Sequence, residues 1–249
     1  MADELTSYLY DHFKMTLTPS QKDAVEALHG PICVISCPGS GKTTVTVIRL
    51  ANLMVKGGVS PQQILALTFS KASAKDMNDR FKSLFPSLAN HVKFATIHSF
   101  AFHIIRHFEQ ISGTRYEFID TPNQMTHSKR QLLASIYLEK SERYLSDDEY
   151  ETITGQISLL KNLMIEPHQT KEIKKYVENE VELFIQVYKA YEQKKEANFF
   201  LDYDDLLTTA YQILIHRDEL RTFYQQRYTH IQIDEAQDTS KIQYELIKL

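Results

Sequence analysis

The segment best suited to do chemistry is a glycine-containing loop near residue 40. It is Ser36-Cys37-Pro38-Gly39-Ser40-Gly41-Lys42-Thr43, between an apolar run at 32–35 and a helical pattern that starts near Lys42. Glycines let backbone N–H groups turn toward phosphate oxygens, and the N-terminus of the following helix adds partial positive charge. The pattern predicts a phosphate loop in which Lys42 reaches the β- and γ-phosphates and Thr43 holds Mg²⁺. Because the strict pattern has glycine where Ser36 stands, an ordinary glycine-rich turn with an exposed lysine remains the alternative.

A second candidate segment follows the short apolar run at 231–233, where Asp234 and Glu235 come directly after it. A phosphate-loop enzyme needs a carboxylate at a strand end to hold Mg²⁺ and a group that orients water for hydrolysis. We expect Asp234 to be the metal partner and Glu235 the general base. The alternative is an acidic surface turn. A small-molecule kinase would not need Glu235 beside Asp234, because its nucleophile is the substrate.

Three apolar runs, at 32–35, 64–67 and 92–95, are each followed by a helical pattern. This rhythm is typical of βαβ units, and runs that are apolar on both faces indicate parallel strands covered by helices on each side. The expected fold class is therefore α/β, a doubly wound parallel sheet of the P-loop type. The helical patterns extend from Lys42, from Ser70 to Leu84, and through Ile104 to about Phe108.

From about residue 111 to 198 the patterns are helical, without convincing strands, and a structureless loop of this length is uncommon in compact proteins. We expect a helical insertion there. The α/β rhythm then resumes, with Asp202 capping a helix and a strand at 231–233. The predicted organisation is an α/β nucleotide domain of residues 1–110 and 199–249 and an all-helical subdomain of residues 111–198.

Composition narrows the class of protein. The chain has 249 residues, 43% apolar, with seven glycines, seven prolines and a net charge of −4, which argues against disordered chains and generally basic nucleic-acid coat proteins. No run approaches the ~18 apolar residues of a membrane helix, and the acidic start is unlike a signal peptide. The two cysteines, Cys33 and Cys37, lack the partners of a zinc site, and we expect them as apolar core and loop filler in a reducing cytoplasm.

Taken together, the motifs resemble the superfamily 1 DNA helicases of the UvrD, Rep and PcrA type. The resemblance covers most of residues 15–110 and 199–249 and is weak across about 111–198. It rests, besides the two nucleotide segments, on Leu17-Thr18-Pro19-Ser20-Gln21-Lys22-Asp23-Ala24-Val25, Thr68-Phe69-Ser70, Ala95-Thr96-Ile97-His98-Ser99-Phe100, Asp202-Tyr203-Asp204-Asp205-Leu206-Leu207 and Gln243.

The resemblance implies a RecA-like ATP-binding domain 1A, incomplete at its C-terminus, with a 1B-like insertion, in the N-terminal region of an ATP-dependent DNA helicase. The full-length protein would use Mg·ATP hydrolysis to move 3′ to 5′ on single-stranded DNA and unwind duplexes at junctions in the bacterial cytoplasm, with further helicase domains in cis. Gln21 would read the adenine edge, and Gln243 would be the glutamine downstream of the metal motif. The family often has arginine where this chain has Thr44, which we include among the nucleotide contacts. Without a second motor half and its arginine finger, this chain alone is expected to be nearly inactive.

The expected DNA contacts are Phe69, Thr68, Thr96 and His98. Phe69 follows a predicted parallel strand, at the edge where α/β proteins bind ligands, and would stack on a base, while the other three would donate to phosphates. Between residues 70 and 95 five basic residues oppose two acidic ones. Core packing for Phe69, a structural role for His98 and a solvated lysine face are the alternatives. Rival functions are the helicase part of a nuclease complex and a nucleotide- or DNA-binding module without activity.

Overall fold

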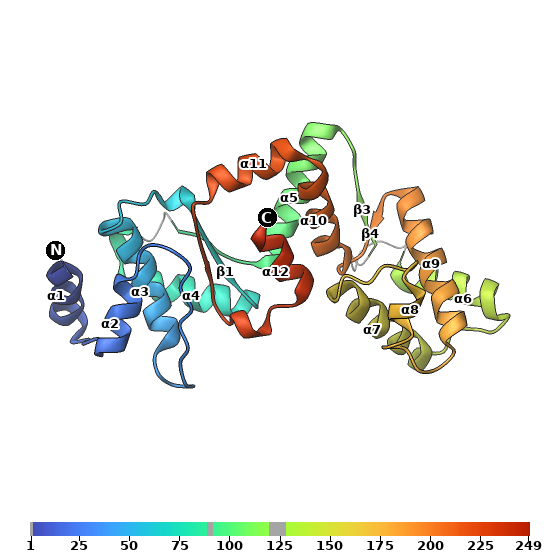
Figure 1. The fold of residues 1–249 in the computed structure, drawn as a ribbon, viewed down its shortest axis with the longest axis horizontal. Helices are drawn as coiled ribbons and strands as arrows, with labels where there is room; N and C mark the ends of the chain where they lie inside the picture. The colour runs from blue at the N-terminus through green and yellow to red at the C-terminus, as the bar shows by residue number, and fades with distance from the viewer. Residues whose placement is uncertain (1, 89–91, 120–127) are drawn as a thin grey trace. The chain divides into compact units, whose positions relative to one another are not determined.

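The computed structural model describes residues 2–88, 92–119 and 128–249. The chain forms two compact units, one of residues 1–97 and 222–238, the other of residues 98–221 and 239–249 (Figure 1). The two units are described separately. Within the expected insertion, residues 120–127 lie outside the described part of the chain.

The first unit is built on a parallel sheet of three strands in the order β2-β1-β5. The strands are β1 (Ile64–Thr68), β2 (Phe94–Thr96) and β5 (His230–Ile233). All five residues of β1 are buried, as expected for a central strand that is covered on both faces. Thr68 is level with Thr96, and Leu67 with Ile233, so the three strands end at one edge of the sheet.

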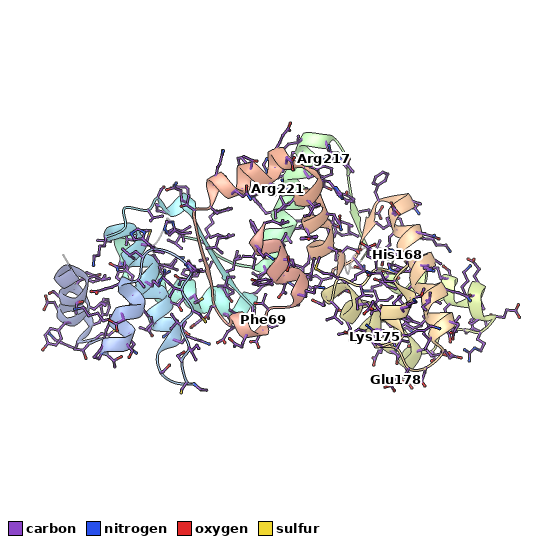
Figure 2. All side chains as sticks on the ribbon, in the orientation of Figure 1. Phe69, His168, Lys175, Glu178, Arg217 and Arg221 are labelled. Carbon is purple, nitrogen blue, oxygen red and sulfur yellow. The ribbon has the colours of Figure 1, made fainter. Side chains whose placement is uncertain are left out.

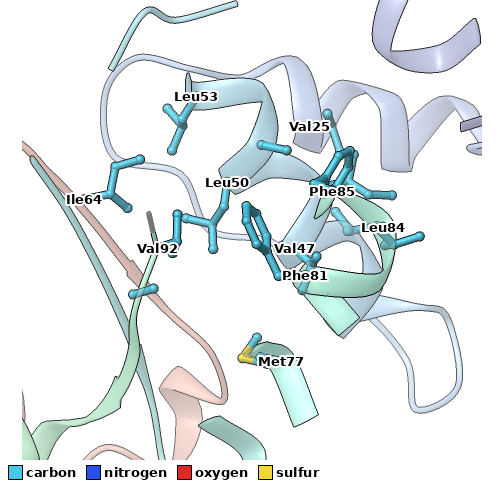
Figure 3. Close-up of a cluster of buried hydrophobic side chains, with 14 of the residues drawn as sticks. Val25, Val47, Leu50, Leu53, Ile64, Met77, Phe81, Leu84, Phe85 and Val92 are labelled. Atoms are coloured by element: carbon cyan, nitrogen blue, oxygen red, sulfur yellow. The ribbon is translucent and has the colours of Figure 1, made fainter. Parts of the chain in front are cut away.

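The helices of this unit are α1 (Ala2–Phe13), α2 (Pro19–Glu26), α3 (Lys42–Val55) and α4 (Lys71–Leu84), with short 3-10 turns at Pro61–Gln63, Pro86–Leu88 and Ala236–Asp238. Ser70 caps α4 by accepting the Ser73 N–H, which explains why the helix starts where its apolar period begins. The core lies between α3 and α4, where Leu50, Leu53 and Phe81 are at most 1% exposed (Figure 3).

The apolar run at 32–35 is not a strand, which corrects the sequence-based expectation. Residues 30–36 form no regular structure and are exposed, and Ile35 is 93% exposed. Cys33 and Cys37 are exposed as well, so the expectation that they fill core and loop was wrong for Cys33. The apolar composition of a segment indicates that it can be buried. A strand also has to pair with a neighbouring strand, and the composition of the segment does not predict that pairing.

The second unit is mainly helical. It contains α5 (Ile97–Ser112, from His98 on), α6 (Lys129–Ser141), α7 (Asp147–Asn162), α8 (Thr170–Ile173), α9 (Val181–Asn198), α10 (Asp205–His216) and α12 (Lys241–Lys248), and α11 (Asp218–Arg227) crosses the boundary. Tyr137, Tyr188 and Tyr191 are the largest buried side chains of its core.

A parallel pair of two-residue strands, β3 (Glu117–Phe118) and β4 (Phe200–Leu201), also lies in this unit. The sequence predicted no strand at 117–118, because two residues are too few to show an alternating pattern. Among the described residues, no helix is both long and apolar enough to span a bilayer.

Candidate functional site

The candidate phosphate loop combines two left-handed glycines with an open helix start. Gly39 and Gly41 have φ of 77° and 82°, values that a residue with a Cβ adopts only under strain. Gly41 is also the N-cap of α3 and gives the helix no side-chain hydrogen bond. The first N–H groups of α3, which have no acceptor within the helix, are therefore oriented to receive an anion.

Gln21 joins α2 to this loop. Its Oε1 accepts from the Thr18 N–H at 2.9 Å, the Thr18 hydroxyl accepts from the Gln21 N–H, and together they form a capping box at the start of α2. The Gln21 Nε2 donates to the Ser40 carbonyl at 2.8 Å. Each end of the Gln21 amide keeps one further hydrogen-bonding position, which a base edge could use.

Lys42 and Glu235 meet at the start of α3. The Lys42 Nζ lies 2.5 Å from the Glu235 Oε1, with both side chains about one-third exposed (30% and 35%). Hydrogen bonds from Lys42 and Gln237 lower the pKa of Glu235, which keeps it an anion. Its backbone is left-handed, with φ of 54°, and such strain in a residue other than glycine is concentrated at functional sites. The sequence pattern predicted Glu235 as a site residue but did not predict its backbone conformation.

Asp234 follows β5 directly and is 8% exposed. Its N–H donates to the Leu67 carbonyl at 2.9 Å, which holds the residue at the edge where the strands end. Burial raises the pKa of Asp234, while the Lys42 ammonium partly opposes the shift. Thr43 is half-buried on α3. A carboxylate and a hydroxyl are oxygen donors of the kind that Mg²⁺ takes, usually together with water and substrate phosphates.

Two polar side chains fix α3 against β5. The Arg49 Nη1 donates to the Gln232 Oε1 at 2.9 Å and its Nη2 to the Ala27 carbonyl at 2.8 Å. The Gln232 Nε2 donates in turn to the Thr46 carbonyl at 2.8 Å. These bonds connect the helix that carries Lys42 with the strand that leads to Asp234. Sequence reasoning missed the pair, because neither residue belongs to a recognised pattern.

The candidate DNA residues of the first unit lie at the same edge of the sheet but differ in exposure. Phe69 is 57% exposed, so the alternative that it packs in the core is wrong (Figure 2). Thr68 and Thr96 are buried, at 1% and 6%. In this conformation only Phe69 of the three offers a wide surface to a ligand.

His98 lies in the second unit, where its ring stacks on that of Tyr203 at 4.6 Å and 14°. Burial lowers the pKa of His98, and the Asp204 carboxylate partly opposes the shift. Tyr203 is 55% exposed, so the pair offers an aromatic surface. The sequence analysis did not predict a role for Tyr203. The pattern that could have indicated one is an aromatic residue between the carboxylates of residues 202–205.

The carboxylates beside Tyr203 are anchored in a buried charge cluster. Asp202 accepts from the Tyr191 hydroxyl at 2.8 Å, and the Lys195 Nζ lies 2.8 Å from the Asp205 Oδ2. Lys161 also pairs with Asp205. Burial alone would raise the pKa of Asp202, but the ammonium groups around it outweigh burial and hold that pKa well below its usual range.

Two further predicted residues have local partners. The N-cap of α10 is Asp204 and not the predicted Asp202, although the Asp202 Oδ1 accepts the N–H of Asp205, the first residue of the helix, at 2.9 Å. Gln243, in the second unit, is 6% exposed, and its Oε1 accepts from the Ser240 N–H at 3.0 Å in a capping box of α12. In this conformation the Gln243 side chain therefore caps the N-terminus of α12, the helix to which it belongs.

The sequence matches the family model described as UvrD/REP helicase N-terminal domain over residues 17–249. The chain is 32% identical over 246 residues to the ATP-dependent DNA helicase PcrA of Bacillus subtilis (strain 168), covering 97% of this chain and 32% of that protein. It is also 32% identical to the PcrA proteins of Staphylococcus epidermidis (strain ATCC 35984) over 234 residues and Staphylococcus aureus (strain Mu50) over 236 residues, covering 94% of this chain and 31% of each relative. The chain thus spans about a third of the length of these relatives.

The match runs through both nucleotide segments and through the region between them, where motif resemblance was weak. It agrees with the order of motifs on which the resemblance rested. The chain belongs to the UvrD/REP helicase N-terminal domain family.

Proposed function

We propose that the chain is the ATP-binding region of a DNA helicase, in which ATP is hydrolysed where α3 and β5 meet. The observation that carries the proposal is the 2.5 Å contact of Lys42 with Glu235, which unites two segments distant in the sequence. The first segment is the N-terminus of α3, which follows two glycines with left-handed backbone and has no side-chain cap. The second is the pair of carboxylates that follows β5. An anion-binding helix start beside a base and a metal carboxylate suits phosphoryl transfer to water.

In this proposal each residue has a separate task. The backbone of residues 36–41 and the ammonium of Lys42 bind the β- and γ-phosphates. Asp234 and the Thr43 hydroxyl hold Mg²⁺, which neutralises developing phosphate charge when bound. Glu235, kept anionic by its hydrogen bonds, orients a water molecule and takes its proton. Gln21 contacts the adenine edge, and Thr44 lies at the nucleoside side.

The DNA-binding part of the proposal rests on Phe69. It is exposed beside the carboxyl ends of the strands, where bound nucleotide and a stacked base would be close enough to influence each other. His98, with Tyr203 stacked on it, would offer a second contact. Thr68 and Thr96 would donate to phosphates once this edge opens, because both are buried here.

For the whole protein we propose ATP-driven movement 3′ to 5′ on single-stranded DNA and unwinding of duplexes, with further helicase domains in cis. The names of the bacterial relatives, ATP-dependent DNA helicase, support the substrate and activity, and we place the protein on DNA in the bacterial cytoplasm. Residues 1–110 and 199–249 would be domain 1A and residues 111–198 domain 1B.

Titration of the purified chain with a fluorescent ATP analogue, with and without Mg²⁺, tests the nucleotide site. We expect binding that strengthens with Mg²⁺ and is lost in Lys42→Ala, with Lys56→Ala as the matched control, since Lys56 is an exposed lysine at the other end of α3. Binding that survives Lys42→Ala, or that Lys56→Ala weakens equally, would contradict the proposal.

A further inference from the structure

Arg80 of α4 reaches the first turn of α3. Its Nη1 donates to the Thr44 Oγ1 at 2.9 Å. The carboxylate that the structure gives Arg80 is Asp76, at 3.7 Å from Nη2, and these two side chains are 43% and 63% exposed. A guanidinium has five N–H donors. One hydroxyl and one loosely placed carboxylate therefore leave Arg80 with charge and donors available to a ligand.

Arg80 contacts α3 on a different side from the residues that are proposed to bind phosphate. With 3.6 residues per turn, Lys42 and Thr44 are roughly 200° apart around the helix, on opposite sides. Gly41 and Thr44 are three residues apart, so they are neighbours on one side. A Cβ at residue 41 would come 3.3 Å from the Gln21 Nε2. Arg80 and Gln21 therefore flank the same side of this helix start, away from the Lys42–Glu235 pair.

We infer that Arg80 is a nucleotide-binding residue that contacts the base of the bound nucleotide. The inference deepens the proposed function and rests on it. The phosphate end is fixed by Lys42 and the carboxylates after β5, so the nucleoside extends toward the other side of the helix start. There the Gln21 amide offers hydrogen bonds to a base edge, and the planar guanidinium of Arg80 offers a surface that stacks on a ring face. Thr44 holds the guanidinium in place through its hydroxyl.

Calorimetric titration of the purified chain with ATP and with inorganic tripolyphosphate, both with Mg²⁺, separates nucleoside contacts from phosphate contacts. We expect Arg80→Ala to lower the affinity for ATP by about three- to thirtyfold, the range of a lost guanidinium–ring stack, and to leave tripolyphosphate within about twofold. Thr44→Val should give a smaller loss of the same kind. Lys56→Ala, at the far end of α3, should change neither affinity.

Equal losses for ATP and tripolyphosphate would make Arg80 a phosphate contact and overturn the inference. No loss for either probe would make it only a tether between α4 and α3, which overturns it too. If Arg80→Ala melts at a lower temperature than the wild type, Arg80→Lys supplies the comparison, because lysine keeps the charge without the planar surface and should lose the same preference for ATP. A wild-type chain that bound neither probe would overturn the proposed function itself.

Discussion

The Lys42 ammonium and the Glu235 carboxylate neutralise each other across 2.5 Å. In the proposed function both act on one nucleotide, Lys42 on its phosphates and Glu235 on the attacking water. Phosphate oxygens would therefore compete with Glu235 for the same ammonium. In the proposed function the pair would be a resting arrangement that nucleotide binding breaks.

Replacing Glu235 with Gln should tighten nucleotide binding while removing the base. Partly exposed ion pairs contribute about 0.2–1 kcal/mol, so we expect the affinity for Mg·ATP to rise by no more than about fivefold. Fluorescence titration of the purified chain measures it. Glu151→Gln, which removes an exposed carboxylate from α7, is the charge-matched control. Weaker binding in Glu235→Gln would mean that the carboxylate assists the bound nucleotide rather than competing with it.

Phe69→Ala should weaken binding of single-stranded DNA. Stacking of a base on an aromatic ring contributes about 1–3 kcal/mol, so the loss should be at least about fivefold. Fluorescence anisotropy with a labelled oligonucleotide at several salt concentrations measures it. Tyr144→Ala removes an aromatic ring that is 87% exposed in the second unit and should leave binding unchanged. Equal affinities for the Phe69→Ala variant and the wild type would remove Phe69 from the DNA contacts.

Lys195→Met should destabilise the second unit strongly. The Lys195 side chain is 3% exposed and lies 2.8 Å from Asp205 and 2.9 Å from Glu192. Removing one partner of a buried ion pair typically costs about 3–5 kcal/mol, because the remaining charge has lost its solvation and its partner. Urea unfolding measures the change. Lys194→Met, at the neighbouring and more exposed position, should cost less than about 0.5 kcal/mol. A small effect in Lys195→Met would show that Lys161 and Lys129 balance the carboxylates without it.

Stability should fall as pH drops below about 6.5 because of His98. Burial lowers the pKa of His98 in the folded chain, so the unfolded chain binds more protons in the interval between the folded and unfolded pKa values. The contribution is therefore present above the unfolded pKa and is lost as pH falls through the folded one. Urea unfolding at pH 7.5 and 5.5 should show a smaller pH dependence in His98→Gln than in His103→Gln, which replaces an exposed histidine of the same helix. Identical pH dependence in both variants would exclude His98 as a source.

Elements with local determinants were predictable from the sequence. The helix expected from Ser70 to Leu84 is α4, with Ser70 as its cap, and the run at 64–67 is within β1. The signals are the capping residue and apolar spacing of the helix and the continuous apolar run of the strand, and all of them lie within the segments themselves. The run at 32–35 failed for the opposite reason, because pairing with another strand depends on distant residues.

The candidate site was predictable as residue types but not as contacts. The motifs indicated Lys42 and Glu235. Their pairing, the hydrogen bond of Arg80 to Thr44 and the stacking of Tyr203 on His98 depend on how separate elements pack. The capping box of Thr18 and Gln21 was visible as a spacing of three residues. The hydrogen bond of Gln21 to the Ser40 carbonyl could not be predicted, because any residue has a backbone carbonyl and the sequence does not mark which one accepts.

The hydrogen bonds of Arg49 and Gln232 bear on how this part of the chain can change during evolution. The Arg49 Nε is buried and has no hydrogen-bond partner within the described ranges, so the guanidinium already carries an unmet donor. Replacing Gln232 would leave the Arg49 Nη1 without this acceptor as well, and replacing Arg49 would leave the Gln232 Oε1 without its donor. Each single replacement is therefore costly, whereas a joint replacement by two apolar residues removes both side chains together and leaves only the Ala27 carbonyl without its Arg49 donor. We therefore expect positions 49 and 232 to covary among relatives as a coupled pair.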